Sequence, residues 1–223
     1  MKIQEYADRD ILAIDLAGML ADELSAHLQH HETASLAVPG GTTPGPVFDA
    51  LCAADLEWDR VRVLPTDERW VSQDHPRSNA ALICDRLITN RAASARFLPL
   101  YAPADEPDRV LADVEAMLAP ELPLSVLLLG MGADMHTASL FPGAGGLERA
   151  LSAKAPVVSV VRPADQPEVR VSLSARVLDE ALSKHLIIYG AEKRTALERA
   201  TMLPPEQAPI QAVLSEMTVH WAE

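Results

Sequence analysis

The sequence predicts an α/β fold in which a mainly parallel sheet is covered by helices on both faces. Segments whose apolar residues recur at helical spacing alternate along the chain with short apolar runs that are typical of strands. The run over residues 124–130 is apolar on both sides, as expected for a strand at the centre of a parallel sheet. A chain of 223 residues suffices for one sizeable core, so we expect a single domain over residues 1–223.

Helices are predicted where apolar residues lie three and four apart, and strands where short apolar runs end at turn residues. The expected helices cover 10–31, 45–54, 78–89, 106–118, 175–182 and 191–200, with a last short helix before residue 218. The expected strands cover 34–38, 61–66, 96–101, 124–130, 156–161, 169–174 and 184–190. Ligands of such sheets bind outside the carboxyl ends of the strands, so the residues that follow these strands are the candidates for a site.

The composition excludes several classes of partner. The formal net charge is −13, and such an acidic chain repels nucleic acid and anionic membranes at long range. No apolar run approaches the roughly 20 residues that cross a bilayer, and the N-terminus lacks the pattern of a signal peptide. We therefore expect a cytoplasmic monomer that binds neither nucleic acid nor membrane. A small phosphorylated molecule can still bind through a local cluster of cations and backbone N–H groups.

The stretch 38–48 has the form of a phosphate-binding loop. Gly40 and Gly41 allow the backbone to turn sharply and to approach an anion closely. We expect Thr43 to cap the following helix, with Pro44 at its first position. The N–H groups of Gly41, Thr42 and Thr43 are then available to an anion at the helix N-terminus. The Lys and Ser/Thr of the nucleotide P-loop are missing, which disfavours ATP or GTP, and a plain strand–turn–helix connection is the alternative.

Three adjacent charged residues, Asp67, Glu68 and Arg69, follow the strand over 61–66. Three such charges usually form a solvated turn, but these lie at the edge of the sheet where ligands bind. At that edge Asp67 is suited to bind sugar hydroxyls or to carry protons. Arg69 is suited to hold a carbonyl oxygen or a phosphate.

The sharpest signal is the pair Asp134 and His136, in a glycine-flanked loop directly after the central strand. An aspartate can hold one imidazole nitrogen and leave the other free as a base, and the unperturbed pKa of histidine, about 6.5, lies near neutral pH. The alternative is a histidine that is merely a polar loop residue. Met135 occupies the third glycine position of a dinucleotide fingerprint, so that pattern fails. Neither an HExxH motif nor a GxSxG elbow around Ser139 is present, which favours acid–base chemistry with water as nucleophile and no metal.

Arg170 and Lys193 are the candidate cations. Arg170 lies within an apolar strand, which is unfavourable unless its guanidinium meets an anion. Lys193 stands in the first turn of a helix, where a cation opposes the helix dipole. Each has an ordinary salt bridge as its alternative explanation, but together with the glycine loop they could neutralise a phosphate.

The motifs in combination resemble those of the 6-phosphogluconolactonases, a family related to the glucosamine-6-phosphate deaminases. They are GGTTP (40–44), TDERWV (66–71), SN (78–79), GMGADMHTASLFPG (130–143), RVSLS (170–174) and GAEK (190–193), in the family's order between residues 36 and 200. The resemblance implies a modified Rossmann-like fold without nucleotide. It also implies hydrolysis of 6-phospho-D-glucono-1,5-lactone to 6-phosphogluconate in the oxidative pentose phosphate pathway, with no metal or organic cofactor.

The resemblance also implies roles for individual residues. His136 is expected to be the general base with Asp134 as its partner, and Asp67 and Arg69 are expected to bind the substrate at the reacting end. The residues expected to hold the phosphosugar are Gly40, Gly41, Thr42, Thr43, Asn79, Arg170 and Lys193.

One position departs from the family pattern. Met135 stands directly before His136, where the family usually has glycine. If the position requires a positive φ, methionine costs about 1 kcal/mol or more there and could shift the histidine. Because the Asp–His pair is intact, we expect activity, in an altered form if the histidine is displaced.

Three other functions remain open. A glucosamine-6-phosphate deaminase needs proton transfer at two carbons, and that branch usually carries further acidic residues after its histidine, where this chain has TASLFPG. A non-catalytic phosphosugar-binding module would use the same loops without turnover. A structural α/β domain would use its loop polar residues only to cap helices.

Overall fold

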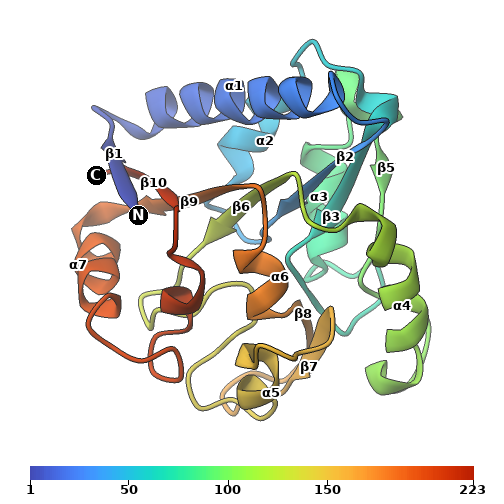
Figure 1. Cartoon of the computed structure of the whole chain (residues 1–223), viewed down its shortest axis with the longest axis vertical. Coiled ribbons are helices and arrows are strands. Elements are labelled where there is room, and N and C mark those ends of the chain that lie inside the picture. Colours follow the sequence, from blue (N-terminus) through green and yellow to red (C-terminus); the bar gives the residue numbers. More distant parts are fainter.

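The computed structural model describes residues 1–223, and seven parallel strands form its central sheet (Figure 1). The strand order is β1-β10-β9-β6-β2-β3-β5. The strands cover Lys2–Glu5 (β1), Thr218–Ala222 (β10), Ser183–Tyr189 (β9), Val126–Gly130 (β6), Ala34–Val38 (β2), Val61–Pro65 (β3) and Arg96–Phe97 (β5). The parallel α/β fold is confirmed, and β6 lies at the centre, between β9 and β2, as predicted.

Strands β1 and β10 are absent from the sequence prediction. β1 is a short edge strand with no fully buried residue, so no apolar run marks it. β10 lies between β1 and β9 and pairs in parallel with both. The two termini consequently lie next to each other at one edge of the sheet (Figure 1).

The segments 156–161 and 169–174 form strands, but these strands lie outside the parallel sheet. They are β7 (Val158–Val161) and β8 (Arg170–Leu173), which pair antiparallel in a three-stranded sheet with β4 (Asp67–Arg69). Residues 162–169 are too few for the crossover of about a dozen residues that a parallel pair needs, so the chain turns back on itself. The charged triplet 67–69 is therefore a paired strand, and the solvated-turn alternative is wrong.

Helices cover both faces of the parallel sheet, as predicted. One core contains residues of α1 (Arg9–Leu28), α2 (Gly45–Leu51) and α3 (Asn79–Arg86). The other contains residues of α4 (Leu111–Leu118), α5 (Leu147–Leu151), α6 (Ala175–Asp179), α7 (Gly190–Ala200) and the 3-10 helix η5 (Pro209–Val213). None of the helices combines the length and the apolar character that crossing a bilayer requires.

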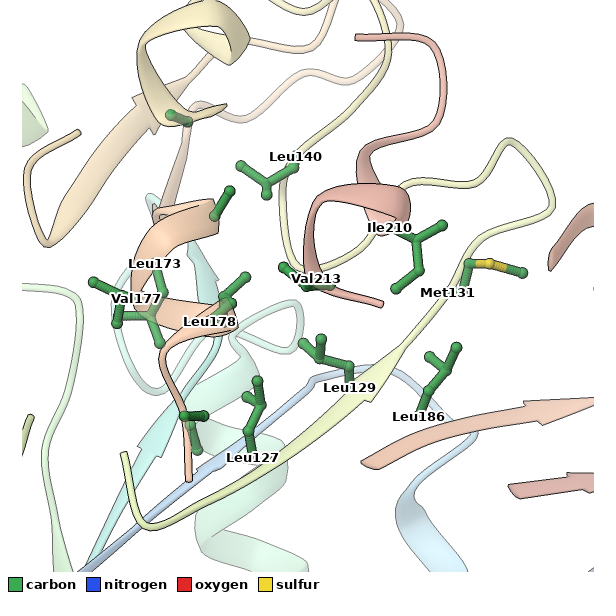
Figure 2. Close-up of a cluster of buried hydrophobic side chains, with 14 of the residues drawn as sticks. Leu127, Leu129, Met131, Leu140, Leu173, Val177, Leu178, Leu186, Ile210 and Val213 are labelled. Atoms are coloured by element: carbon green, nitrogen blue, oxygen red, sulfur yellow. The ribbon is translucent and has the colours of Figure 1, made fainter. Parts of the chain in front are cut away.

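The two cores meet at the strands, because successive side chains of a strand point to opposite faces of the sheet. Val126 and Leu128 of β6 belong to the core beneath α1, whereas Leu127 and Leu129 belong to the core on the other face. Figure 2 shows Leu127 and Leu129 pointing from β6 toward the segment that carries Val213. The central strand is thus buried on both sides, which explains its uninterrupted apolar sequence.

A chain of polar groups, of which His185 and His220 are buried, ties α1 to strands β9 and β10. The hydroxyl of Tyr6 lies 2.8 Å from Oδ2 of Asp15 and 2.9 Å from Nδ1 of His220. Nε2 of His220 lies 3.0 Å from Nδ1 of His185, whose Nε2 lies 2.8 Å from Oε2 of Glu23. Both imidazoles are buried, and the lowered pKa of His220 links its protonation to folding.

We expect the protein to lose stability as the pH falls from about 7 to about 4. Burial, and then the neighbouring His185, lower the pKa of His220 from 6.5 to about 4. The folded chain keeps this imidazole neutral in that window, whereas the unfolded chain binds a proton. The free energy of unfolding should therefore fall with pH, by on the order of 2–3 kcal/mol.

Urea unfolding at several pH values measures this slope. In His220→Gln the slope should shrink, because the titrating group is gone, whereas the exposed His30→Gln variant should keep the slope of the wild type. Equal slopes in the wild type and His220→Gln would show that His220 does not determine the acid stability.

Candidate active site

Polar residues that follow β2, β3, β6 and β9 meet at the carboxyl edge of the parallel sheet and line a pocket of about 370 Å³. Strand β8 adds one further side chain, Arg170. The expected site residues in the wall are Gly40, Gly41, Thr42, Thr43, Asp67, Arg69, Asn79, His136, Arg170 and Lys193. Asp134 is the one expected site residue outside the wall, and it contacts the pocket only through His136.

His136 and Asp134 form a hydrogen-bonded pair. Nδ1 of His136 lies 2.5 Å from Oδ1 of Asp134, and the ring makes no other hydrogen bond, which leaves Nε2 free. The bond to His136 is the main cause of the lowered pKa of Asp134, so the carboxylate is ionised at neutral pH. A carboxylate on Nδ1 fixes the ring orientation and the tautomer, as required of a base that acts through Nε2.

Two residues that the sequence analysis did not select hold the imidazole from either side. A Cβ atom on Gly132 would lie 2.3 Å from the ring of His136, so glycine is required for the ring to occupy this position. The ring of Phe141 packs against the imidazole with a centroid distance of 4.3 Å. The loop itself is closed by Thr137, whose Oγ1 donates to the carbonyl of Gly130 at 2.9 Å.

Met135 has the left-handed backbone that the family's glycine suggests, with a φ of +66°. Its side chain is nonetheless buried and belongs to the core on the α6 side of the sheet. Its carbonyl accepts a hydrogen bond from the N–H of Ile210 at 3.1 Å. Leu140 of the same loop lies in that core as well (Figure 2). The loop is therefore anchored by packing at two points, and the Asp134–His136 bond forms in spite of the methionine.

The glycine loop after β2 lies in the pocket wall, but its helix cap differs from the prediction. Gly41 has a φ of +84°, which explains the need for glycine there. The residue at the N-cap of α2 is Pro44, and no side chain caps the helix, so the expected cap by Thr43 is wrong. The physical reason is that the chain turns once more before the helix starts, with the N–H of Gly45 donating to the carbonyl of Thr42 at 3.3 Å.

Asn79 joins the glycine loop to strand β4. Its Nδ2 donates to the carbonyl of Asp67 at 2.8 Å, and its Oδ1 accepts from Nη1 of Arg69 at 3.1 Å. A Cβ atom on Gly40 would lie 2.0 Å from that same Oδ1, so the glycine permits this close approach. Arg69 also donates to the carbonyl of Arg77 at 2.6 Å, which orients its guanidinium at the pocket.

The neighbouring Glu68 points away from the pocket wall and binds the start of α3. Its buried carboxylate accepts from the backbone N–H groups of Arg69 and Asn79 at 2.8 Å each, and from that of Ala80 at 2.7 Å. The hydroxyl of Ser78 donates to it as well, at 3.1 Å. Burial raises the pKa of Glu68, and the three backbone donors oppose that shift. Glu68 is thus a structural anchor for Asn79 and Arg69.

Asp67 is buried, yet it reaches the pocket wall. Its Oδ2 accepts from the hydroxyl of Ser139 at 2.5 Å, and its Oδ1 accepts from that of Thr66 at 3.3 Å. Ser139 belongs to the histidine loop, so this carboxylate connects that loop to β4. The carboxylate thus binds two hydroxyl groups, and no cation lies within ion-pair distance of it.

Arg170 is a buried cation without a carboxylate partner. Its side chain is 4% exposed, it makes no ion pair within 4 Å, and its Nε has no hydrogen-bond partner. Burial lowers its pKa, and the charge of Asp67 opposes that shift. Its guanidinium carbon lies 5.7 Å from the centre of the Phe141 ring, and its Nη2 donates to the amide oxygen of Gln166. The site thus holds a guanidinium that is available to an anion.

Lys193, in the first turn of α7, is the second such cation. It is half-buried, and burial lowers the pKa of its ammonium group, against the charges of Glu192 and Asp134. The wall therefore carries three permanent cations, on Arg69, Arg170 and Lys193, and a single carboxylate, on Asp67. This local excess of positive charge lies in a chain of net charge −13 and suits a small dianion.

No group of three or more His, Cys, Asp or Glu side chains is placed to hold a metal ion.

Met135→Gly is expected to destabilise the protein. Glycine removes the strain of the positive φ, about 1 kcal/mol, but deletes a buried side chain whose loss costs about 2–5 kcal/mol. The free energy of unfolding in urea should therefore fall by about 1–4 kcal/mol. Met202→Gly, at a methionine that is 85% exposed, is the control and should change it much less. A Met135→Gly variant more stable than the wild type would show that strain outweighs packing.

Comparison with known proteins places this geometry in a family. A family model described as glucosamine-6-phosphate isomerases/6-phosphogluconolactonase matches residues 7–221. A 6-phosphogluconolactonase of Mesorhizobium japonicum is 42% identical over 97% of this chain and 93% of its own length. One of Rhizobium meliloti is 38% identical over 97% of each chain.

Solved structures agree with these sequence matches. A 6-phosphogluconolactonase from Shewanella baltica superimposes with a TM-score of 0.96 at 29% identity, covering 100% of this chain and 98% of its own. A monomeric glucosamine-6-phosphate deaminase, 20% identical, shares the fold with a TM-score of 0.80 over 100% of this chain and 98% of its own. The predicted modified Rossmann-like fold is confirmed, and the chain belongs to the glucosamine-6-phosphate isomerase/6-phosphogluconolactonase family.

Proposed function

We propose that this chain hydrolyses 6-phospho-D-glucono-1,5-lactone to 6-phosphogluconate, the lactonase step of the oxidative pentose phosphate pathway. The observation that carries the proposal is the Asp134-bound imidazole of His136 in the wall of a cation-rich pocket. Relatives that match over nearly the whole chain are named 6-phosphogluconolactonase, which supports the same substrate.

The phosphate of the substrate binds among the cations that lack a carboxylate partner. Arg170 and Lys193 supply two positive charges, and the N–H groups of Gly41 and Thr42 supply donors in the glycine loop. Such charge-assisted hydrogen bonds are the strong ones in proteins. The lactone carbon C1 then lies toward His136, whose ring packs against Phe141.

Hydrolysis follows from the free Nε2 of His136. As a water molecule attacks C1, Nε2 takes its proton, and the ionised Asp134 stabilises the imidazolium that forms. Arg69 and backbone N–H groups stabilise the negative charge that develops on the carbonyl oxygen. The bond between C1 and the ring oxygen then breaks, and the imidazolium returns its proton to that oxygen. The product acid loses its remaining proton to solvent.

The deaminase alternative finds less support in the pocket. Proton transfer at two carbons calls for additional carboxylates, but Asp67 is the only one in the wall, and two hydroxyl groups occupy it. Within residues 137–143, which follow His136 in the same loop, the ones that reach the wall are Ala138 and Phe141, which cannot carry protons. Release of ammonia from glucosamine 6-phosphate is the assay that separates the two activities.

The wild type should accelerate hydrolysis of freshly generated 6-phosphogluconolactone well above its spontaneous rate. His136→Ala should lose about 10²–10⁴-fold of this acceleration, because His136 is the only imidazole in the pocket wall. Asp134→Asn should lose activity too, because an amide does not stabilise the imidazolium. His30→Ala, at an exposed histidine far from the pocket, is the control. Full turnover in His136→Ala would refute the role of the base.

Gly132→Ala tests the position of the imidazole. The added methyl group would lie 2.3 Å from the ring of His136, and the ring is the end of a flexible side chain that can swing away. We expect the lactonase rate to fall about 10²-fold while the melting temperature stays near that of the wild type. Gly18→Ala, where a Cβ atom meets nothing within 4 Å, is the control and should keep full activity. An active Gly132→Ala would mean that catalysis does not depend on this ring position.

A further inference from the structure

Gln166 binds the guanidinium of Arg170, the buried cation that is available to an anion. Its amide oxygen accepts from Nη2 of Arg170, and both side chains line the pocket. No carboxylate lies within ion-pair distance of Arg170, and the Nε of that guanidinium remains without a partner in spite of its burial. A neutral oxygen therefore stands where a charged one would bind more strongly.

The loop that carries Gln166 is held in place on several sides. It connects β7 to β8, and Pro163 and Pro167 restrict the backbone on either side of the glutamine. The carbonyl of Val169 accepts from the N–H of Trp70 at 2.8 Å. The carboxylate of Glu168 lies 2.9 Å from Nη1 of Arg77, in the segment between β4 and α3. The backbone thus presents the glutamine side chain at a defined place beside Arg170.

An amide fits both states of such a site, because it carries an acceptor oxygen and a donor NH₂ group. Its oxygen accepts a hydrogen bond from the guanidinium of Arg170, which keeps the buried cation partly satisfied. When a phosphate oxygen takes over that hydrogen bond, rotation of the amide turns its NH₂ group toward the phosphate as a donor. A carboxylate at this position would pair permanently with Arg170 and repel the phosphate. A thioether would neither accept a strong hydrogen bond from Arg170 nor donate one to the phosphate.

We propose that Gln166 is a specificity residue for the phosphate group of the substrate. Its amide oxygen accepts from Arg170 until a phosphate oxygen replaces it in that hydrogen bond. The NH₂ group of the amide then donates a hydrogen bond to the phosphate. This inference rests on the proposed function, because it assumes that the anion held by Arg170 is the phosphate of a sugar lactone.

The test compares Gln166→Glu and Gln166→Met with the wild type. Gln166→Glu should raise KM for 6-phosphogluconolactone about tenfold or more with kcat nearly unchanged, because its carboxylate competes for Arg170. Calorimetry should show a matching loss of affinity for 6-phosphogluconate. Gln166→Met should raise KM by a few-fold, about 3–10. Both variants should hydrolyse unphosphorylated gluconolactone as the wild type does. The control is Gln207→Glu, which adds the same charge at an exposed position, and it should match the wild type.

Two outcomes would overturn the inference. One is a Gln166→Glu variant whose KM and product affinity stay within about twofold of the wild type. The other is an equal loss on the phosphorylated and the unphosphorylated lactone. If Gln166→Glu does not fold, Gln166→Met decides by the same criteria. An inactive wild type would refute the proposed function instead, and the calorimetric comparison with 6-phosphogluconate would still decide whether Gln166 governs anion binding at Arg170.

Discussion

The arrangement of the site depends on the hydrogen bonds of the buried residue Asp67. The side chain of Asp67 accepts from the hydroxyl of Ser139 in the histidine loop, and its backbone carbonyl accepts from Asn79 beside the glycine loop. Its strand β4 pairs with β8, which places Arg69 opposite Arg170 in the register. The loop that carries His136, the glycine loop beside Asn79 and the strand that carries Arg170 are thereby connected through one residue.

The hydrogen bonds of Asp67 also explain why its carboxylate does not neutralise the cations of the pocket. Hydroxyl groups satisfy the carboxylate of Asp67, so it does not form an ion pair with Arg170. Arg170 consequently depends on the neutral amide of Gln166 and on the face of Phe141. A buried cation with only neutral partners is costly by itself, and the cost is recovered when an anion binds. In so acidic a chain, this local excess of positive charge is the place where we expect an anion to bind.

The sequence predicted the elements whose patterns are strong. The apolar run of β6 and the helical spacing of α1 were sufficient, and the strand-end rule then placed Asp67, His136 and the glycine loop at one edge. What escaped depends on contacts between distant segments. The pairing of β4 with β8 joins segments that lie far apart in the sequence and depends on tertiary packing, so no local pattern shows it.

The same limit applies to the residues that support the site. Nothing local marks Gln166, which reaches the pocket from a proline-rich loop of the second sheet, or Phe141, which reads as a core residue. The sequence shows Gly132 only as a glycine near a histidine. The structure shows why glycine is required there: a Cβ atom would meet the ring of His136. Met135 shows the converse: the sequence raised a conflict at its backbone, and burial of its side chain in the core accommodates it.

A crystal structure of the wild type with bound 6-phosphogluconate tests the central claim most directly. The account predicts the phosphate on Arg170 and Lys193 beside the glycine loop, with the C1 carboxylate about 3 Å from Nε2 of His136. A ligand bound in the reverse direction, with its phosphate on His136, or bound outside this pocket, would contradict the account.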